Sequence, residues 1–222
     1  MISFSALSEI IFPSRCLGCR QLGIKICSTC RAMWHPHIYR TQVTSRVNTF
    51  PVYSAVEYSS VAARVLLSSK ESGLSDADQL IAQALTHSLS YLYGEIGIAD
   101  LVPVPSRKMA TRRRGRDFIS AHTAVLAKSH VVSGAPTRPL LRHIRSVKDQ
   151  SSLNAKERQS NLDGSLECMK KAEWAGIPVI IVDDVITTGA TLREAGRALH
   201  AGGFTVIGAV TACVAKPLRY SQ

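Results

Sequence analysis

Residues 179–196 read VIIVDDVITTGATLREAG, and this stretch decides the fold. Its first four residues are branched and apolar, which is typical of a strand buried on both faces of a parallel sheet. Asp183 and Asp184 follow where such a strand should end. Next come the Thr- and Gly-rich turn ITTGAT and a segment, 190–203, with helical periodicity and two terminal glycines. The stretch therefore predicts a strand, a polar turn and a crossover helix of an α/β domain.

Strand and helix signals alternate on either side of this stretch. Apolar or alternating segments predict strands at 51–60, 98–106, 174–184 and 204–215. Helical spacing predicts helices at 59–73, 76–94, 117–130 and 190–203. The order strand, helix, strand predicts a doubly wound parallel sheet in a domain over residues 50–222, with a small separate module over residues 1–45.

The polar turn has the chemistry of a phosphate cup beside two carboxylates. Gly189 permits a tight turn in which backbone N–H groups converge, and the neighbouring threonine hydroxyls add donors. The Gly-Lys-Ser/Thr ending of a Walker loop is missing. In doubly wound sheets, ligands bind at the carboxyl ends of the strands, so a phosphorylated ribose with hydroxyls for the carboxylates fits. The alternative is an Asp helix cap and a Gly turn without a ligand, but capping needs only one of these side chains.

Four of the six cysteines lie in the segment CLGCRQLGIKICSTC, as Cys16, Cys19, Cys27 and Cys30. Two Cys-x-x-Cys pairs can supply four thiolates in a tetrahedral arrangement, which suits a structural Zn²⁺ in a small ribbon-like module. Two redox pairs or two disulfides are the alternatives, and disulfides are rare in a reducing compartment. Cys168 and Cys213 are solitary, so we expect free thiols there.

The motif VIIVDDVITTGAT resembles the phosphoribosyl-pyrophosphate (PRPP) motif of type I phosphoribosyltransferases. The resemblance implies that Asp183 and Asp184 bind the ribose hydroxyls. It also assigns the 5′-phosphate to the cup residues Thr187, Thr188, Gly189, Ala190 and Thr191. A receiver-type phosphorylation domain fits less well, because its acidic pair lies near the first strand rather than near the penultimate one.

Two further segments resemble the ComF family of competence-associated proteins, which combine a cysteine zinc module with a phosphoribosyltransferase-like domain. DLVPVPSRKMATRRRGRDF (100–118) is similar to the family's Pro-Val-Pro stretch and Arg-Gly pair, although RGRDF stands where the family more often has Arg-Gly-Phe-Asn-Gln. The segment 140–166 is similar to its Arg, Gln, Leu, Arg, Asn series.

The Pro-Val-Pro segment is expected to end a strand and to present a second anion-binding loop. The resemblance places pyrophosphate on Val104, Pro105 and Ser106, with Mg²⁺ bound to the pyrophosphate of PRPP, since Mg²⁺ prefers to bridge phosphate oxygens. If the site is catalytic, Arg107 and Lys108 would stabilise the charge of the leaving pyrophosphate. The sequence gives no signal for an acceptor base.

Positive charge is the strongest feature of the composition. The 222 residues include 27 Lys and Arg against 16 Asp and Glu, a formal net charge of +11. Such an excess favours polyanionic or phosphorylated partners, or it simply keeps the protein soluble. The densest cluster predicts contacts with nucleic-acid phosphates, or cations for a small phosphate ligand, at Arg112, Arg113, Arg114 and Arg116.

Two functions therefore follow from the sequence. The first is a ComF-like accessory protein of DNA uptake that binds PRPP and, by the resemblance, single-stranded DNA or the import helicase. The second is an active phosphoribosyltransferase that releases pyrophosphate. No segment reaches the roughly 20 apolar residues of a membrane span, so we expect a cytoplasmic protein without membrane insertion.

Overall fold

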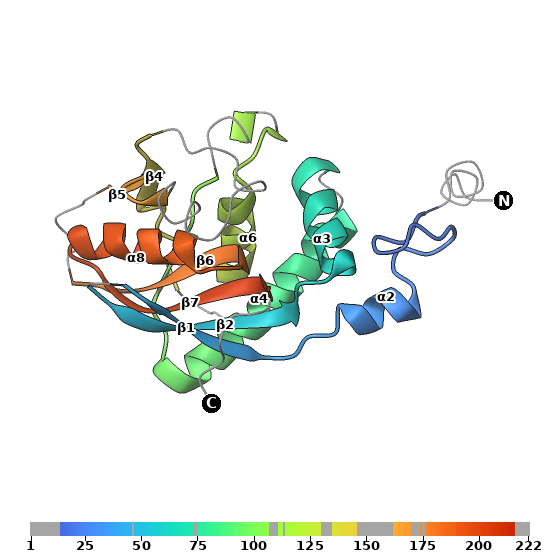
Figure 1. Ribbon diagram of the computed structural model, residues 1–222, viewed down its shortest axis with the longest axis horizontal. Helices are drawn as coiled ribbons and strands as arrows, with labels where there is room; N and C mark the ends of the chain where they lie inside the picture. The colour runs from blue at the N-terminus through green and yellow to red at the C-terminus, as the bar shows by residue number, and fades with distance from the viewer. Residues whose placement is uncertain are drawn as a thin grey trace.

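The computed structural model describes residues 14–45, 47–72, 75–106, 111, 112, 114–129, 135–145, 162–169, 174 and 176–215. Its centre is a five-stranded sheet in the order β1-β2-β7-β6-β3 (Figure 1). The strands are β1 (Tyr39–Thr44), β2 (Thr49–Glu57), β3 (Asp100–Pro103), β6 (Pro178–Ile186) and β7 (Thr205–Val214). A separate two-stranded sheet is formed by β4 (Leu141–His143) and β5 (Leu166–Cys168).

Four of the five central strands are parallel. β2, β7, β6 and β3 pair in parallel, and β1 adds an antiparallel edge strand to β2. The predicted parallel α/β sheet is confirmed, and the structure adds an antiparallel strand at one edge. The sequence division assigned residues 39–44 to the N-terminal module, but in the structure they form β1 of the sheet because they pair along their whole length with β2.

Helices cover both faces of the sheet (Figure 1). α4 (Ser75–Ile96) packs against β2 and β7, and α6 (Phe118–Ala127) packs against α4 and β3. α8 (Ala190–Ala201) covers the other face, against β6 and β7. α3 (Ser60–Leu67) continues into a π-helical turn, η1 (Ser68–Ser72), where the sequence predicted one short helix. Within the described residues, no helix is long and apolar enough to cross a bilayer.

The core forms two layers because alternate residues of each strand face opposite sides of the sheet. In β6, Ile180 and Val182 belong to the layer under α4 and α6, and Val179 and Ile181 belong to the layer under α8. All four side chains are fully buried. This explains the uninterrupted apolar run in the sequence, since a strand covered on both faces has no solvent side.

The β4–β5 hairpin is attached to α8 through a buried carboxylate. Glu194 is 2% exposed and accepts a hydrogen bond from the Leu166 backbone N–H at 2.9 Å. Arg197 donates to Glu194 and also to the Leu166 carbonyl. The two side chains satisfy the backbone groups that an edge strand would otherwise leave unpaired. The hairpin and α8 are thereby held together.

The N-terminal module packs against α3. It consists of the cysteine loop and the short helix α2 (Ser28–Met33) (Figure 1). Its buried residues Leu17, Ile26 and Trp34 join the same core layer as Val61 and Val65 of α3. The module therefore shares a hydrophobic core with the α/β domain.

Candidate functional site

The acidic pair lies near the carboxyl end of β6, which is flanked by β7 and β3 in the sheet. Asp183 and Asp184 are each 7% exposed. Pro103, at the end of β3, is paired with Val182, and the Val104 N–H donates to the Val182 carbonyl at 2.9 Å. The Pro-Val-Pro loop and the carboxylates, distant in sequence, are therefore neighbours at one edge of the sheet.

The predicted phosphate cup follows β6 directly. Gly189 has φ +72° and precedes the first residue of α8, Ala190. A Cβ at position 189 would lie 3.1 Å from a Val43 methyl group, so the backbone conformation favours glycine and a larger residue would have to displace Val43 slightly. Thr187 is exposed, and Thr188 and Thr191 are half-buried at the helix N-terminus. Free backbone N–H groups at this helix end suit an anion.

A lysine that the sequence analysis did not single out contacts the acidic pair. Lys70, in η1, donates a hydrogen bond to Asp184 Oδ2 and forms an ion pair with it. The Lys70 side chain is 28% exposed and that of Asp184 is 10% exposed. Lys70 Nζ also lies 5.3 Å from the centroid of the Phe118 ring. No motif marks Lys70, because its role depends on a helix folding back to the end of a strand 114 residues away.

Burial and this ion pair set opposite protonation tendencies in the two aspartates. Burial raises the pKa of Asp183 well above its usual range, and the neighbouring Asp184 charge raises it further. Burial also opposes ionisation of Asp184, but the charge and hydrogen bond of Lys70 lower its pKa overall. Although burial lowers the pKa of Lys70, Asp184 raises it overall. The site therefore favours a neutral Asp183 beside an ionised Asp184 and a cationic Lys70.

A second network fixes the segment that carries Lys70. Arg116 donates to both oxygens of Asp78, each at 3.0 Å, and to the Ser69 carbonyl at 2.7 Å. The Ser69 hydroxyl donates to the same Asp78 carboxylate. Burial opposes ionisation of Asp78, but Arg116 and Ser69 lower its pKa overall. Arg116, which belongs to the cluster predicted to contact DNA, anchors η1 to α4 in the structure.

The predicted pyrophosphate loop is held at Ser106 by contacts within the protein. The Ser106 N–H donates to Asp117 at 3.0 Å, and its hydroxyl donates to the same carboxylate at 3.2 Å. The sequence interpretation expected the Ser106 amide to face an anion, but in this structure Asp117, the N-cap of α6, accepts it. His143 Nε2 lies 3.0 Å from the Pro105 carbonyl, which links the β4–β5 hairpin to this loop.

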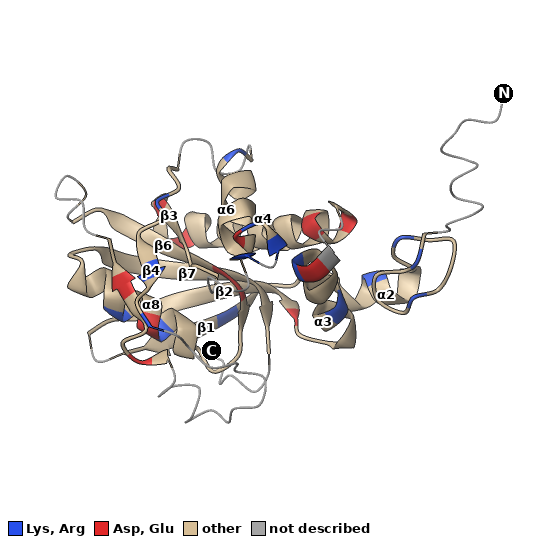
Figure 2. Cartoon of the chain, turned by 90° about the horizontal axis from the view of Figure 1, so that it is seen from above, with Lys and Arg blue, Asp and Glu red and all other residues tan. Residues whose placement is uncertain are grey.

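The remaining predicted cations divide between described and undescribed residues. Arg107, Lys108 and Arg113 lie outside the described residues. Arg112 is exposed, and Arg114 is half-buried with its Nε shielded from solvent and without a hydrogen-bond partner. Arginines also lie on α2, α3 and α8 (Figure 2). Among the described residues, Arg112 and Arg114 are thus left as candidate anion contacts from this cluster.

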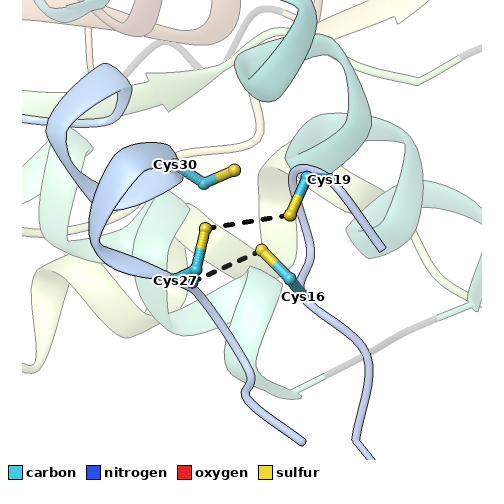
Figure 3. Close-up of side chains that lie close together, drawn as sticks. All are labelled: Cys16, Cys19, Cys27 and Cys30. Atoms are coloured by element: carbon cyan, nitrogen blue, oxygen red, sulfur yellow. Dashed lines mark hydrogen bonds between the residues drawn. The ribbon is translucent and has the colours of Figure 1, made fainter. Parts of the chain in front are cut away.

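The four clustered cysteines converge on one point (Figure 3). Their sulfur atoms all lie within 4.8 Å of one another, and those of Cys19 and Cys27 are 3.7 Å apart. Four thiolates around Zn²⁺, with Zn–S bonds of about 2.3 Å, would be separated by about 3.8 Å. All four cysteines are free thiols. The cluster could hold a metal ion, and its geometry matches a four-sulfur site.

The backbone of the cysteine loop prepares this arrangement. The Arg20 N–H donates to the Cys16 carbonyl at 2.9 Å, and Arg20 has φ +69°, which closes the first knuckle. A Cβ at Gly18 would lie 2.5 Å from the Cys30 sulfur, so a larger residue would push the two knuckles apart. Burial opposes thiolate formation at Cys16, but nearby backbone N–H groups lower its pKa to about 6. A low thiol pKa favours the ligating form.

Comparison with known proteins finds a domain family that matches the part of the chain carrying the acidic pair and the cup. Residues 122–221, which contain β6, the cup, α8 and β7, match the phosphoribosyl transferase domain family. The chain is also 29% identical over 101 residues to Competence protein F of Haemophilus influenzae (strain ATCC 51907 / DSM 11121 / KW20 / Rd). That match spans 45% of this chain and 43% of the relative.

The two matches together are consistent with a ComF-like family, as the sequence resemblance predicted.

Solved adenine phosphoribosyltransferases follow a partly similar path. One has a TM-score of 0.44 and 19% identity over 84% of this chain and 89% of that chain. Another, from Saccharomyces cerevisiae in complex with D-2,5-dideoxy-2,5-imino-altritol 1,6-bisphosphate and adenine, has a TM-score of 0.42 and 17% identity. The second match covers 85% of this chain and 89% of that chain.

Proposed function

We propose that this protein is a ComF-like accessory protein of DNA uptake that binds PRPP at the carboxyl edge of its sheet. The observation that carries this proposal is the buried pair Asp183–Asp184 directly before the Gly189 turn and the N-terminus of α8. Carboxylates can accept hydrogen bonds from the ribose hydroxyls, and the N-terminus of α8 can bind the 5′-phosphate. The similarity to Competence protein F supports the role in competence.

The pyrophosphate of PRPP would lie toward the Val104–Ser106 loop, which borders the acidic pair. Mg²⁺ would accompany it, bound to phosphate oxygens and water, because pyrophosphate is a hard, highly charged ligand. Arg107 and Lys108 remain the proposed catalytic cations. The alternative function is transfer of ribose 5-phosphate to a base or amine, and the phosphoribosyl transferase domain match favours testing it.

Asp184→Asn is expected to weaken binding of PRPP with Mg²⁺ by about 10- to 100-fold. The substitution removes a charge-assisted hydrogen bond and leaves Lys70 without its partner, and such bonds contribute about 1.5–3 kcal/mol. Isothermal titration calorimetry of both proteins measures the change. Asp76→Asn, which instead removes an exposed ion pair between Asp76 of α4 and Lys25 of the cysteine module, is the control and should bind as wild type does.

The same proteins distinguish the accessory role from the enzyme. Pyrophosphate release is measured with PRPP and a panel of nucleobases and amines. Binding without release for every acceptor supports the accessory role, and turnover that Asp184→Asn abolishes supports the transferase. Failure of wild-type protein to bind PRPP at all would contradict both.

We further propose that the cysteine cluster of the 1–45 module binds a structural Zn²⁺. Four thiolates leave no open coordination position, so the metal would stabilise the fold rather than act in catalysis. The ligands would be Cys16, Cys19, Cys27 and Cys30.

Single-stranded DNA is the proposed macromolecular partner, with the import helicase as the second possibility. Exchange of Arg112, Arg113 and Arg114 for glutamine should weaken DNA binding at low salt. It should also reduce the slope of log K against log salt by about 0.7 for each DNA phosphate that the variant no longer neutralises. Fluorescence anisotropy with a labelled oligonucleotide at several salt concentrations measures both quantities.

The control for the DNA experiment removes the same charge elsewhere. Arg15, Arg20 and Arg31 are exposed residues of the cysteine module, and their exchange for glutamine should leave the slope closer to wild type. If wild-type protein does not bind the oligonucleotide even at low salt, the DNA proposal is wrong.

A further inference from the structure

Lys70 occupies the position next to the acidic pair where a cation is needed. Two adjacent buried carboxylates repel each other and also repel a phosphate, and burial in a low dielectric strengthens both effects. The Lys70 ammonium donates a hydrogen bond to Asp184 Oδ2 and forms an ion pair with that carboxylate. The charges of Lys70 and ionised Asp184 cancel, so with Asp183 neutral this group of three carries no net charge. An anionic sugar phosphate can then approach without a further cation.

The residues around Lys70 hold its segment in place. Arg116 and Asp78 fix the Ser69 carbonyl and hydroxyl, one residue before Lys70. The Phe118 ring, 1% exposed, lies beside the ammonium and supports a cation–π contact. A lysine anchored in this way is preorganised for the site.

A divalent ion fits poorly against the same carboxylate. One of the two Asp184 carboxylate oxygens, Oδ2, already accepts the Lys70 hydrogen bond. Arg114 adds further positive charge near Lys70, since its field acts against protonation of that lysine. The negative charge of the Asp184 carboxylate is therefore already balanced by cations of the protein.

We propose that Lys70 is the resident counter-ion of the ribose subsite, so that this subsite binds a ribose phosphate without a divalent metal ion. The inference rests on the proposed function and refines it: Mg²⁺ serves the pyrophosphate of PRPP, and a ligand without pyrophosphate does not need it.

Ribose 5-phosphate is the probe, because it carries the ribose hydroxyls and the 5′-phosphate but no pyrophosphate. Its dissociation constant is measured by calorimetry in EDTA and in millimolar Mg²⁺. For wild type we expect the two values to agree within about twofold. For Lys70→Met we expect binding in EDTA to be weaker by about tenfold or more, and Mg²⁺ to restore a substantial part of the loss.

Three variants control for charge and folding. Lys70→Arg keeps the charge and should stay within a few-fold of wild type. Lys25→Met removes an exposed Lys–Asp pair and should not change the affinity. The double variant Lys70→Met/Asp184→Asn removes both partners, and its thermal midpoint should recover at least part of what Lys70→Met loses, because no unpaired charge stays buried.

The outcomes separate this inference from the proposed function. Strong Mg²⁺ dependence in wild type, or full affinity of Lys70→Met in EDTA, overturns the role of Lys70 and leaves ribose phosphate binding intact. Absence of ribose 5-phosphate binding by wild type in both buffers overturns the proposed function, and the inference with it.

Discussion

Cys30→Ser is expected to release the proposed zinc ion and to lower the thermal midpoint of the protein by about 5–10 °C. Cys30 is 3% exposed, and its sulfur belongs to the four-sulfur cluster. A serine hydroxyl is a much weaker ligand than a thiolate, and binding of a structural zinc ion contributes about 10–16 kcal/mol to folding of small zinc modules. Because the module shares its core with α3, the loss should spread into the α/β domain.

Zinc content and thermal unfolding together measure this effect. Reduced wild-type protein should contain about one zinc ion per chain by metal analysis, and Cys30→Ser should lose most of it on dialysis against a mild chelator. Cys168→Ser is the matched control, since Cys168 lies on β5, outside the cluster, and forms no disulfide. If reduced wild-type protein contains no metal, the four-thiolate interpretation is wrong.

The fold could be predicted from the sequence where an element has a recognisable pattern of apolar residues or of terminal glycines. The apolar run before Asp183 identified β6, and the glycines at 202 and 203 marked the end of α8. β1 gave no such signal, because it is a half-exposed edge strand whose pairing depends on a partner. The hairpin strands β4 and β5 are only three residues each, too short for a period to be visible.

The candidate site could be predicted only as far as its motifs extend. The carboxylates and the cup are contiguous in sequence, so their chemistry was visible together. Lys70 was not predicted, because helix η1 brings it to Asp184 through tertiary packing. The contacts of Arg116 were not predicted for the same reason: a cluster of arginines in the sequence gives no indication that Asp78, 38 residues earlier, accepts a hydrogen bond from one of them.

A further large effect is expected for Gly189→Ala, which should weaken binding of ribose 5-phosphate by about 30-fold or more. Gly189 has φ +72°, a conformation that costs a residue with a Cβ about 1–2 kcal/mol. The added methyl would also lie 3.1 Å from Val43, so β1 or the turn must shift. A shift of the turn misaligns the N–H groups at the start of α8, and these groups are the proposed ligands of the 5′-phosphate.

Gly97→Ala is the control for Gly189→Ala, because it introduces similar backbone strain at a glycine outside the phosphate cup. Gly97 has φ +89° and follows α4, before the amino end of β3, and a Cβ there would meet nothing within 4 Å. Because the backbone strain is similar, this substitution should also lower the free energy of unfolding by about 1–2 kcal/mol. It should leave the affinity for ribose 5-phosphate unchanged. Denaturant unfolding and calorimetry measure the two quantities independently. If the two variants bind ribose 5-phosphate with equal affinity, the turn at Gly189 does not hold the phosphate, because backbone strain is the only effect that the two substitutions share.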